Sequence, residues 1–377
     1  MIIGFAKETF PGEKRVAMAP TVISGLKKAG FEFIMQVGAG QEAGFPDSTY
    51  QEKGVNIISS REEVFKKADI VLMVRALGAN SKTGKDDIPL MRKGQSIIAL
   101  MEPSKCQEDI ENLSKAGINA FSLELIPRIT RAQSMDVLSS MATVSGYKAV
   151  ILAAEHLPQM FPLLMTAAGT VAASRAFIIG AGVAGLQAIA TAKRLGAIVQ
   201  AYDVRSAVKE QIESLGAKFV ELPLETKSAE GQGGYAKEMD SNSLNRQREL
   251  MAKAVAESDV VISTASVPGK KAPMLISKDM VSKMKWGSVI VDMAAGQGGN
   301  CELTRPEETV KLGNVTILGP TNLASTLPYD ASLMFARNVA NFVQYIVQDN
   351  ALKLDPDDEI VKATLVTGVP ELTSQKS

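Results

Sequence analysis

Short apolar runs alternate with amphipathic helical patterns along most of the 377-residue chain. Apolar runs of strand length that are separated by helices predict βαβ units and a mainly parallel sheet. In the first third of the chain we expect strands at 2–6, 32–37, 55–58, 70–74, 96–100 and 119–122, with helices at 21–29 and 107–116 among the elements between them.

The rhythm breaks near 127–140 and is followed by an unusually long helical pattern at 134–157. A second series then begins, with strands at 175–179, 198–202, 259–263 and 288–292 and helices at 183–195 and 207–215. Two consecutive series of this kind predict an α/β fold with two Rossmann-like, doubly wound parallel-sheet domains and an interdomain cleft.

The last strong helical pattern, at 332–347, has no sheet of its own, so we expect it to pack on the first domain and make that domain discontinuous. The expected domains are 1–133 with 329–377, and 134–328, which includes the linking helix 134–157. Beyond Asn350 the chain is polar and is interpreted as a tail or linker.

The stretch 222–245 is rich in glycine and polar residues and shows no clear period. A loop this long in a compact domain is usually a lid, a binding loop or disordered, and a dispensable surface insertion is the plainer alternative. Tyr235, which follows two glycines, favours a mobile loop that closes over a flat ligand.

Composition narrows the classes of function. The chain carries 41 Lys+Arg against 41 Asp+Glu, so its charge gives no reason to expect nucleic acid as a partner. It has a single histidine, His156, and its two cysteines, Cys106 and Cys301, lie far apart, so no metal site or disulfide framework is expected. No secretory signal opens the chain, and its apolar stretches fall short of the ~20 residues that span a bilayer. We therefore expect a soluble chain.

A dinucleotide-binding pattern begins at the end of the strand 175–179. Gly180, Gly182 and Gly185 form G-x-G-x-x-G between that strand and a helix, and the next strand ends in Asp203. The first glycine permits a sharp turn, the second lets the backbone approach a pyrophosphate, and the third allows close packing of helix and strand. An acid at this distance accepts ribose hydroxyls and favours NAD over NADP, although Arg205 could accommodate a 2′-phosphate. A glycine turn needed only for packing is the alternative.

A dense polar cluster lies where the first domain passes into the long helix. Ser134 is interpreted as its N-cap, with Asp136 in the first turn. That role does not explain Arg128, Arg131 and Gln133, whose donors and acceptors suit a nicotinamide carboxamide.

The run P-R-I-T-R-A-Q-S-M-D-V-L-S-S at 127–140 closely resembles a signature of the NAD(H)-binding alpha subunit of proton-translocating NAD(P)+ transhydrogenases. The segments 165–170, 180–190 and 233–239 resemble the same family, and 7–17 is shared with the related alanine dehydrogenases. The resemblance covers nearly the whole chain.

The resemblance implies hydride transfer between NADH on this chain and NADP+ on a partner subunit, in a Re/Si-specific enzyme that is coupled to proton translocation. It implies that Arg128, Gln133, Asp136 and Ser139 surround the nicotinamide and are the catalytic set, with Gln133 reaching toward the partner's nucleotide. The implied nucleotide-binding set comprises these four residues together with Ser134, Met135, Gly180, Gly182, Val183, Gly185, Asp203, Val204, Arg205, Gly234, Tyr235, Gln247 and Ser266. The implied cofactors are NAD(H) here and NADP(H) on the partner.

The family also implies a homodimer and two further partners, an NADP(H)-binding subunit and a membrane-spanning proton-channel subunit. Through these partners the chain would be peripheral on the inner face of the cytoplasmic membrane, without a span of its own.

Two other functions stay open. An alanine dehydrogenase-like enzyme must move a proton as well as a hydride, yet Arg75 stands where that family has a lysine and no histidine lies nearby. A non-catalytic NAD(H)-sensing module would need the glycine motif but not the cluster at 128–139. Direct hydride exchange between nucleotides needs no proton at the reacting carbons, which suits a chain with one histidine.

Overall fold

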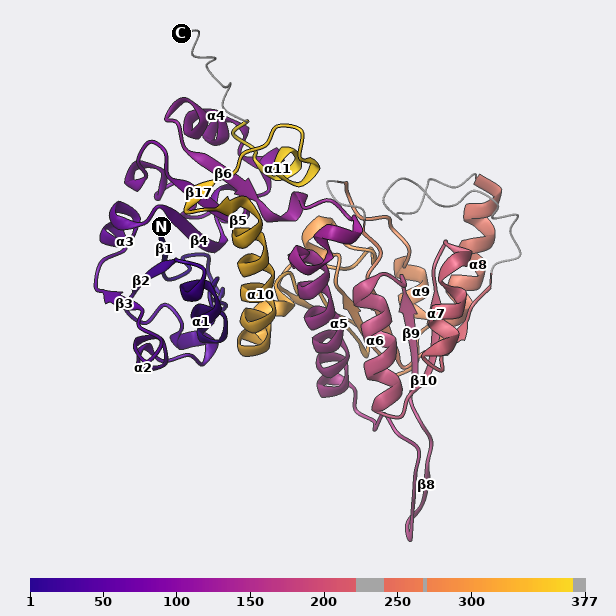
Figure 1. Ribbon diagram of the computed structural model, residues 1–377. Helices are drawn as coiled ribbons and strands as arrows, with labels where there is room; N and C mark the ends of the chain where they lie inside the picture. Colours follow the sequence, from indigo (N-terminus) through magenta and orange to yellow (C-terminus); the bar gives the residue numbers. More distant parts are fainter. Residues whose placement is uncertain (222–240, 267–269, 369–377) are drawn as a thin grey trace, which may run out of the picture. The chain divides into compact units, whose positions relative to one another are not determined.

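A computed structural model describes residues 1–221, 241–266 and 270–368, without the side chains of residues 241–247. Contacts within the chain divide it into two compact units (Figure 1). Unit 1 comprises Met1–Met141 and Ala324–Ser377, and unit 2 comprises Ala142–Leu323. The breaks thus fall after Met141 and before Ala324, where the sequence places them at 133/134 and 328/329.

Unit 1 contains a six-stranded parallel sheet in the order β3-β2-β1-β4-β5-β6. This order reverses between β1 and β4, which is the mark of a doubly wound sheet. Its strands are β1 (Ile2–Phe5), β2 (Glu32–Gln36), β3 (Asn56–Ile58), β4 (Ile70–Arg75), β5 (Ser96–Leu100) and β6 (Asn119–Ser122). Each agrees with its predicted range to within a residue at either end.

Helices complete unit 1. Its short helices are α1 (Pro20–Lys28), α2 (Asp47–Gln51), α3 (Arg61–Lys67) and α4 (Gln107–Lys115). The long helix α10 (Pro328–Ile346) begins four residues before its predicted start, with proline in its first turn, and Phe342 contacts Phe121 of β6 edge-on. The expected packing of this helix on the first domain is therefore observed.

The expectation of a tail beyond Asn350 is wrong for the part that the structure describes. A short strand pair, β16 (Val347–Gln348) and β17 (Ala351–Leu352), precedes helix α11 (Glu359–Thr364). Ile360, Val361 and Leu365 are buried, and Leu365 pairs with Phe121. A few apolar residues in a polar segment thus suffice to anchor it to the sheet.

Unit 2 contains a seven-stranded sheet in the order β11-β10-β9-β12-β13-β15-β14. It is parallel except at the edge pair β14–β15, and its order reverses between β9 and β12. The strands are β9 (Arg175–Ile179), β10 (Ile198–Tyr202), β11 (Lys218–Phe219), β12 (Val260–Ser263), β13 (Val289–Asp292), β14 (Thr309–Leu312) and β15 (Val315–Leu318). Both sheets therefore confirm the predicted fold class.

Alternate residues of these strands face two separate cores. Ile178 of β9 lies in a core with α5 (Val137–His156) and α6 (Val183–Arg194), to which α7 (Lys209–Ser214) also contributes. Phe177 lies in the opposite core with α8 (Ser241–Glu257) and α9 (Lys278–Ser282). Helix α8 begins inside the predicted loop 222–245, so the loop prediction is wrong from Ser241 onward, and 222–240 lie outside the described residues.

Helix α5 starts later than the pattern predicts. Residues Thr130–Met135 form a 3-10 helix, η6, and the side chain of Asp136 caps α5 by accepting the N–H of Ser139 at 2.9 Å. Ser134 is therefore not the N-cap. Its carbonyl instead accepts hydrogen bonds from Asn338 and Asn341 of α10, at 2.8 and 3.0 Å.

Among the described helices, α5 alone is long and apolar enough to cross a membrane by length and composition. This is weak support for a span, because a core helix passes the same test. Ala149, Val150 and Ala153 of α5 are fully buried in the core of unit 2.

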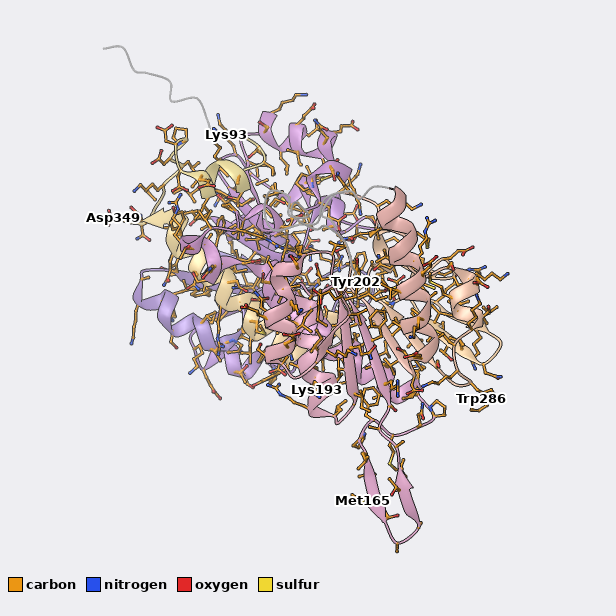
Figure 2. All side chains as sticks on the ribbon, turned by 90° about the vertical axis from the view of Figure 1, so that its right-hand side faces the viewer. Lys93, Met165, Lys193, Tyr202, Trp286 and Asp349 are labelled. Atoms are coloured by element: carbon orange, nitrogen blue, oxygen red, sulfur yellow. The ribbon has the colours of Figure 1, made fainter. Side chains whose placement is uncertain are left out.

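A two-stranded antiparallel hairpin, β7 (Leu164–Thr166) and β8 (Gly169–Val171), projects from the sheet of unit 2 (Figures 1 and 2). Every residue of both strands is exposed, and Met165 is 79% exposed. The strand predictions from the sequence do not include this hairpin.

Candidate functional site

The glycine turn of unit 2 lies at the switch point of the sheet, between the carboxyl ends of β9 and β12. Gly180 has φ +96°, a conformation that side chains rarely adopt, and its N–H donates to the carbonyl of Tyr202 at 2.8 Å. A Cβ at Gly185 would lie 1.9 Å from the carbonyl oxygen of Gly180. The protein's own packing therefore requires glycine at both positions.

Gly182 is different, because the protein itself does not require a glycine there. Its φ is −75°, and a Cβ built on it would meet no atom within 4 Å. Gly182 is the N-cap of α6 and provides no side chain to bond the first N–H groups of the helix. An open backbone at the positive end of a twelve-residue helix forms a cradle for an anionic group such as a pyrophosphate. The residues present thus fit a dinucleotide.

Asp203 follows β10, and its buried carboxylate accepts four hydrogen bonds. The N–H of Ala181, in the glycine turn, donates to Oδ2 at 2.7 Å. Arg205 donates from its backbone N–H and from Nε to Oδ1, both at 2.9 Å, and from Nη2 to Oδ2 at 2.9 Å. The acid therefore braces the turn, and Arg205 occupies the oxygens that a ribose would use. Ribose hydroxyls can bind there only when they displace the guanidinium.

The end of β12 packs directly on the glycine turn. Thr264 donates its N–H to Ile179 at 2.8 Å and its hydroxyl to Gly180 at 3.2 Å. Beside it, Asp292 at the end of β13 is fully buried and accepts five hydrogen bonds, two of them from the N–H groups of Asn300 and Cys301.

Sequence reasoning missed Thr264, Asp292 and Asn300. A signal was present, since a polar residue ends each of two apolar strands and a run of glycines precedes Asn300. Polar residues at the carboxyl ends of parallel strands are typical of binding sites in such folds.

The polar cluster of unit 1 is ordered around the start of α5. The two oxygens of Asp136 accept the N–H and the hydroxyl of Ser139, at 2.9 and 2.5 Å, so these two predicted site residues lie together. Gln133 is exposed on η6 and Met135 is buried beneath it. Arg128 is exposed just upstream. This leaves amide and guanidinium groups on the surface beside a capped helix.

Arg131, which lies inside this cluster, has a structural partner. Its guanidinium bonds the hydroxyl of Tyr345 at 2.8 Å and the carboxylate of Asp358 at 2.9 Å. Asp358 caps α11, so Arg131 joins η6 to the last two helices of unit 1.

The remaining predicted site residues are only partly described. Gly234 and Tyr235 lie outside the described residues, as does the side chain of Gln247 on α8. Ser266 is exposed after β12. Val183 is exposed in the first turn of α6, and Val204 packs against the core beside Asp203.

The switch point of unit 1 carries buried charge of its own. Glu13 pairs with Arg15 at 2.6 Å and with Arg75 at 3.0 Å, and its side chain is fully buried. Glu8 accepts the N–H groups of Val74 and Arg75. Burial raises the pKa of Glu8 to about 8 against these hydrogen bonds, so Glu8 is largely protonated near neutral pH.

His156 lies at the other end of α5, where Nδ1 is 2.9 Å from the carbonyl oxygen of Leu152. It is exposed in the last turn of its helix. Within the residues that the structure describes, no three His, Cys, Asp or Glu side chains form a group that could hold a metal ion.

Comparison with known proteins identifies relatives along the whole chain. Sequence models of the alanine dehydrogenase/PNT N-terminal and C-terminal domains match residues 4–145 and 149–375. An NAD(P) transhydrogenase subunit alpha of Rhodospirillum rubrum is 45% identical over 97% of this chain and 96% of its own length. The alanine dehydrogenase of Bacillus subtilis is 27% identical over 99% of this chain and 93% of its own length.

Solved structures agree. A transhydrogenase from Sinorhizobium meliloti superposes with a TM-score of 0.85 at 42% identity, covering 97% of both chains. An L-alanine dehydrogenase superposes with a TM-score of 0.79 at 26% identity, over 98% of this chain and 97% of its own.

Proposed function

Because this chain belongs to the alanine dehydrogenase/PNT family, and within it to the NAD(P) transhydrogenase alpha subunits, we propose that it binds NAD(H) and exchanges hydride with NADP(H) on a partner subunit. The observation that carries this proposal is the match to a transhydrogenase subunit over nearly the full length of both chains.

Unit 2 holds the NAD(H) in this proposal. The open backbone at Gly182 and the N-terminus of α6 bind the pyrophosphate, since Gly182 leaves the first turn of the helix without a side-chain cap. Asp203 accepts the ribose hydroxyls of the adenosine half after Arg205 moves aside. Its carboxylate also repels a 2′-phosphate, which favours NAD(H) over NADP(H).

When bound, the nucleotide supplies the hydride, and the residues of this chain orient it. We assign Gln133, Asp136, Ser139 and Arg128 to the nicotinamide ring. Asp136 and Ser139 already hold one another, and the exposed amide of Gln133 offers a donor and an acceptor to a carboxamide. The chain's task is to exclude water and hold the ring at about 3–3.5 Å from the accepting carbon.

This chemistry needs no general acid or base in unit 1. Oxidation of an amine does need one, because the proton of the substrate must be removed. Arg75 is committed to Glu13, and His156 lies at the exposed end of α5. The identity of 45% to a transhydrogenase subunit against 27% to an alanine dehydrogenase points the same way.

We further propose that the NADP(H) site and the proton channel lie on other subunits. The described residues contain one glycine turn with a following acid, and that acid disfavours a 2′-phosphate. The chain would then be held at the inner face of the cytoplasmic membrane by those subunits, with proton movement coupled to the hydride step.

The test is reconstitution. The isolated chain is loaded with NADH, and an NADP+-loaded partner subunit is added while NADPH formation is followed. We expect hydride exchange only in the mixture. Alanine-dependent reduction of NAD+ by the isolated chain would overturn the proposal in favour of an amino-acid dehydrogenase.

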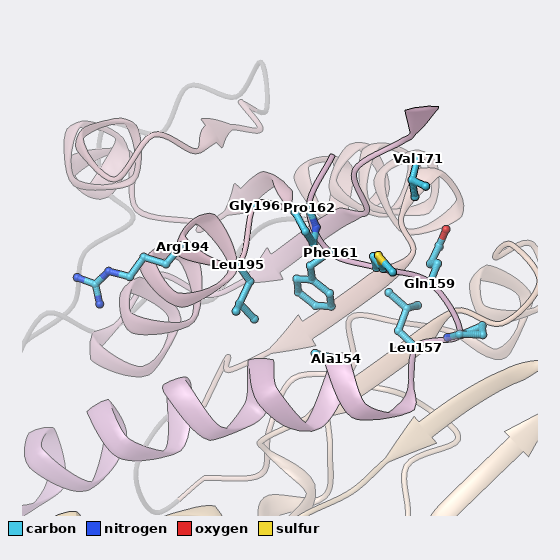
Figure 3. A pocket seen from close by; sticks show the side chains of 11 residues that line it. Ala154, Leu157, Gln159, Phe161, Pro162, Val171, Arg194, Leu195 and Gly196 are labelled. Atoms are coloured by element: carbon cyan, nitrogen blue, oxygen red, sulfur yellow. The ribbon is translucent and has the colours of Figure 1, made fainter. Parts of the chain in front are cut away.

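We also propose a homodimer joined through the hairpin β7–β8. An isolated two-stranded hairpin with both faces in water is marginally stable, so its strands favour a partner. Met165 and Leu164 present apolar side chains on the hairpin. An open apolar groove of about 1000 Å³, which includes Leu157, Phe161 and Leu195, lies at the base of the same hairpin (Figure 3). A second copy can fill both by reciprocal exchange.

Sedimentation of a Met165→Asp variant tests the dimer. A buried, unpaired carboxylate at the interface is expected to shift the chain toward monomer at micromolar concentration. Met274→Asp, at a methionine that is also about half exposed on unit 2, is the control and is expected to stay dimeric. A Met165→Asp variant as dimeric as wild type would refute the role of the hairpin.

A further inference from the structure

We propose that Asn300 is a positioning residue for the nicotinamide half of the bound nucleotide, acting through the segment that follows β12. The inference rests on the proposed binding of NAD(H) to unit 2, and it assigns a role to a residue that contacts neither the glycine turn nor Asp203.

The order of strands divides the two halves of the nucleotide between different strand ends. In a doubly wound sheet a dinucleotide crosses the switch point, here the gap between β9 and β12. Asp203 follows β10, on one side of that gap, and serves the adenosine half. The ends of β12 and β13 lie on the other side, so the nicotinamide half extends toward Thr264 and the residues after Asp292.

Asn300 is completely buried and joins two stretches of backbone in this region. Its Nδ2 donates to the carbonyl of Ala265 and to the carbonyl of Pro273, both at 2.8 Å. Its own carbonyl accepts the N–H groups of Leu275 and Ile276, at 2.8 and 2.9 Å. One amide side chain thus fixes both the segment after β12 and the segment that leads to α9.

Asp292 holds Asn300 in place. Its Oδ2 accepts the N–H of Asn300 at 2.7 Å, and its Oδ1 accepts the hydroxyl of Ser263, the last residue of β12, at 3.1 Å. The carboxylate therefore ties the ends of β12 and β13 to the loop that carries Asn300.

The clamp reaches the glycine turn through one residue. Ala265, whose carbonyl Asn300 holds, follows Thr264, and the hydroxyl of Thr264 donates to Gly180. A Cβ at Gly180 would lie 3.2 Å from the N–H nitrogen of Ala265, so this backbone is close to the turn. Releasing Ala265 therefore loosens the nicotinamide side of the turn and leaves the contact of Asp203 with Ala181 untouched.

Asn300 also shows a feature unusual for a residue with only a packing role. Its Oδ1 is buried and has no hydrogen-bond partner among the described residues. Unpaired buried acceptors are uncommon in folded proteins, and each one calls for an explanation. The need to hold two carbonyls at once with Nδ2 supplies that explanation here.

The experiment compares NADH with AMP, which carries only the adenosine half. In Asn300→Ala we expect NADH to bind about tenfold more weakly and AMP to bind within twofold of wild type, both measured by calorimetry on the full chain. The fluorescence change of the bound dihydronicotinamide should also be smaller. If the alanine variant does not fold, Asn300→Ser is used, since its hydroxyl can still donate to one carbonyl.

Gln95→Ala is the matched control. Gln95 is likewise fully buried, and its Nε2 donates to two carbonyls, those of Phe65 and Ala68, at 2.6 and 2.8 Å in unit 1. It should lose stability as Asn300→Ala does and keep wild-type affinity for NADH.

Three outcomes decide the matter. Selective loss of NADH affinity supports the inference. Unchanged NADH affinity, or an equal loss for NADH and AMP, overturns it and leaves Asn300 with a structural role alone. Failure of the wild-type chain to bind NADH overturns the proposed function itself and is visible before any variant is made.

Discussion

Replacing Gly182 by alanine separates the needs of the protein from the needs of its ligand. Gly182 has a negative φ, and a Cβ there meets nothing within 4 Å, so the folded chain can accept a methyl group without strain. The same change at Gly180 or Gly185 would clash with Thr264 or with the Gly180 carbonyl. A loss of NADH binding in Gly182→Ala would therefore report on the space that the pyrophosphate uses.

The expected sizes follow from two opposing effects on stability and one on binding. Alanine is a poorer N-cap than glycine, but it also restricts the unfolded chain by about 0.4–1 kcal/mol, so the stability of the free protein should change by less than about 1 kcal/mol. A methyl group forced into a filled contact costs about 1–3 kcal/mol. At about 1.4 kcal/mol per factor of ten, NADH should bind roughly 5- to 150-fold more weakly.

Thermal unfolding with and without NADH measures both quantities in one experiment. At a concentration about 100 times the wild-type Kd, NADH stabilises the wild type by about 2.7 kcal/mol, and a tenfold weaker variant by about 1.4 kcal/mol. Gly25→Ala is the control, since Gly25 lies in the exposed face of α1 and a Cβ there also meets nothing within 4 Å. A Gly182→Ala chain that NADH stabilises as fully as wild type would refute the cradle.

Three further changes probe other parts of the account. Asp203→Asn should weaken NADH and AMP alike by about tenfold and raise the affinity for NADPH relative to NADH, because the charge that repels a 2′-phosphate is gone; an unchanged NADPH-to-NADH ratio in calorimetry would contradict this. Gln133→Ala should leave the Kd for NADH within about twofold and slow stopped-flow hydride transfer to a partner subunit at least about tenfold, and unchanged transfer would place the nicotinamide elsewhere. Glu8 has its pKa raised to about 8 by burial, so between pH 4.5 and 8 the folded chain holds a proton that the unfolded chain has lost. The free energy of unfolding of the wild type should then fall as pH rises through that window, by at most about 1.4 kcal/mol per pH unit. Glu8→Gln should lack this slope in denaturant titrations, and parallel curves for the two proteins would refute it.

The strands could be predicted closely because buried parallel strands are continuous apolar runs that end where burial ends. The ranges 96–100, 119–122, 175–179 and 198–202 coincide with β5, β6, β9 and β10. Helix starts are less well determined. Ser134 and Asp136 are both good caps, and the bonds from α10 to the carbonyl of Ser134 are set by residues that lie far along the chain, Asn338 and Asn341.

The segment after Asn350 shows the same limit. Its low hydrophobicity predicts a tail, yet three buried side chains anchor it to the sheet of unit 1. That gain depends on a surface that the rest of the unit creates, which no local pattern contains.

For the candidate site, local chemistry could be predicted and long-range contacts could not. The glycine turn and Asp203 follow from spacing along two adjacent strands. The bonds among Asp292, Asn300 and Ala265 join the ends of two strands with the loop after the second, and Arg205 covers Asp203 by a side-chain choice that spacing does not specify.

The most direct test of the central claim is a single-turnover mixing experiment. The chain is loaded with NADH and mixed with a partner subunit that carries NADP+, and both nucleotides are followed by absorbance and fluorescence. The account predicts rapid hydride exchange in the mixture and none with either component alone. No exchange with a partner shown to bind, or steady NADH formation from alanine and NAD+ by the isolated chain, would contradict it.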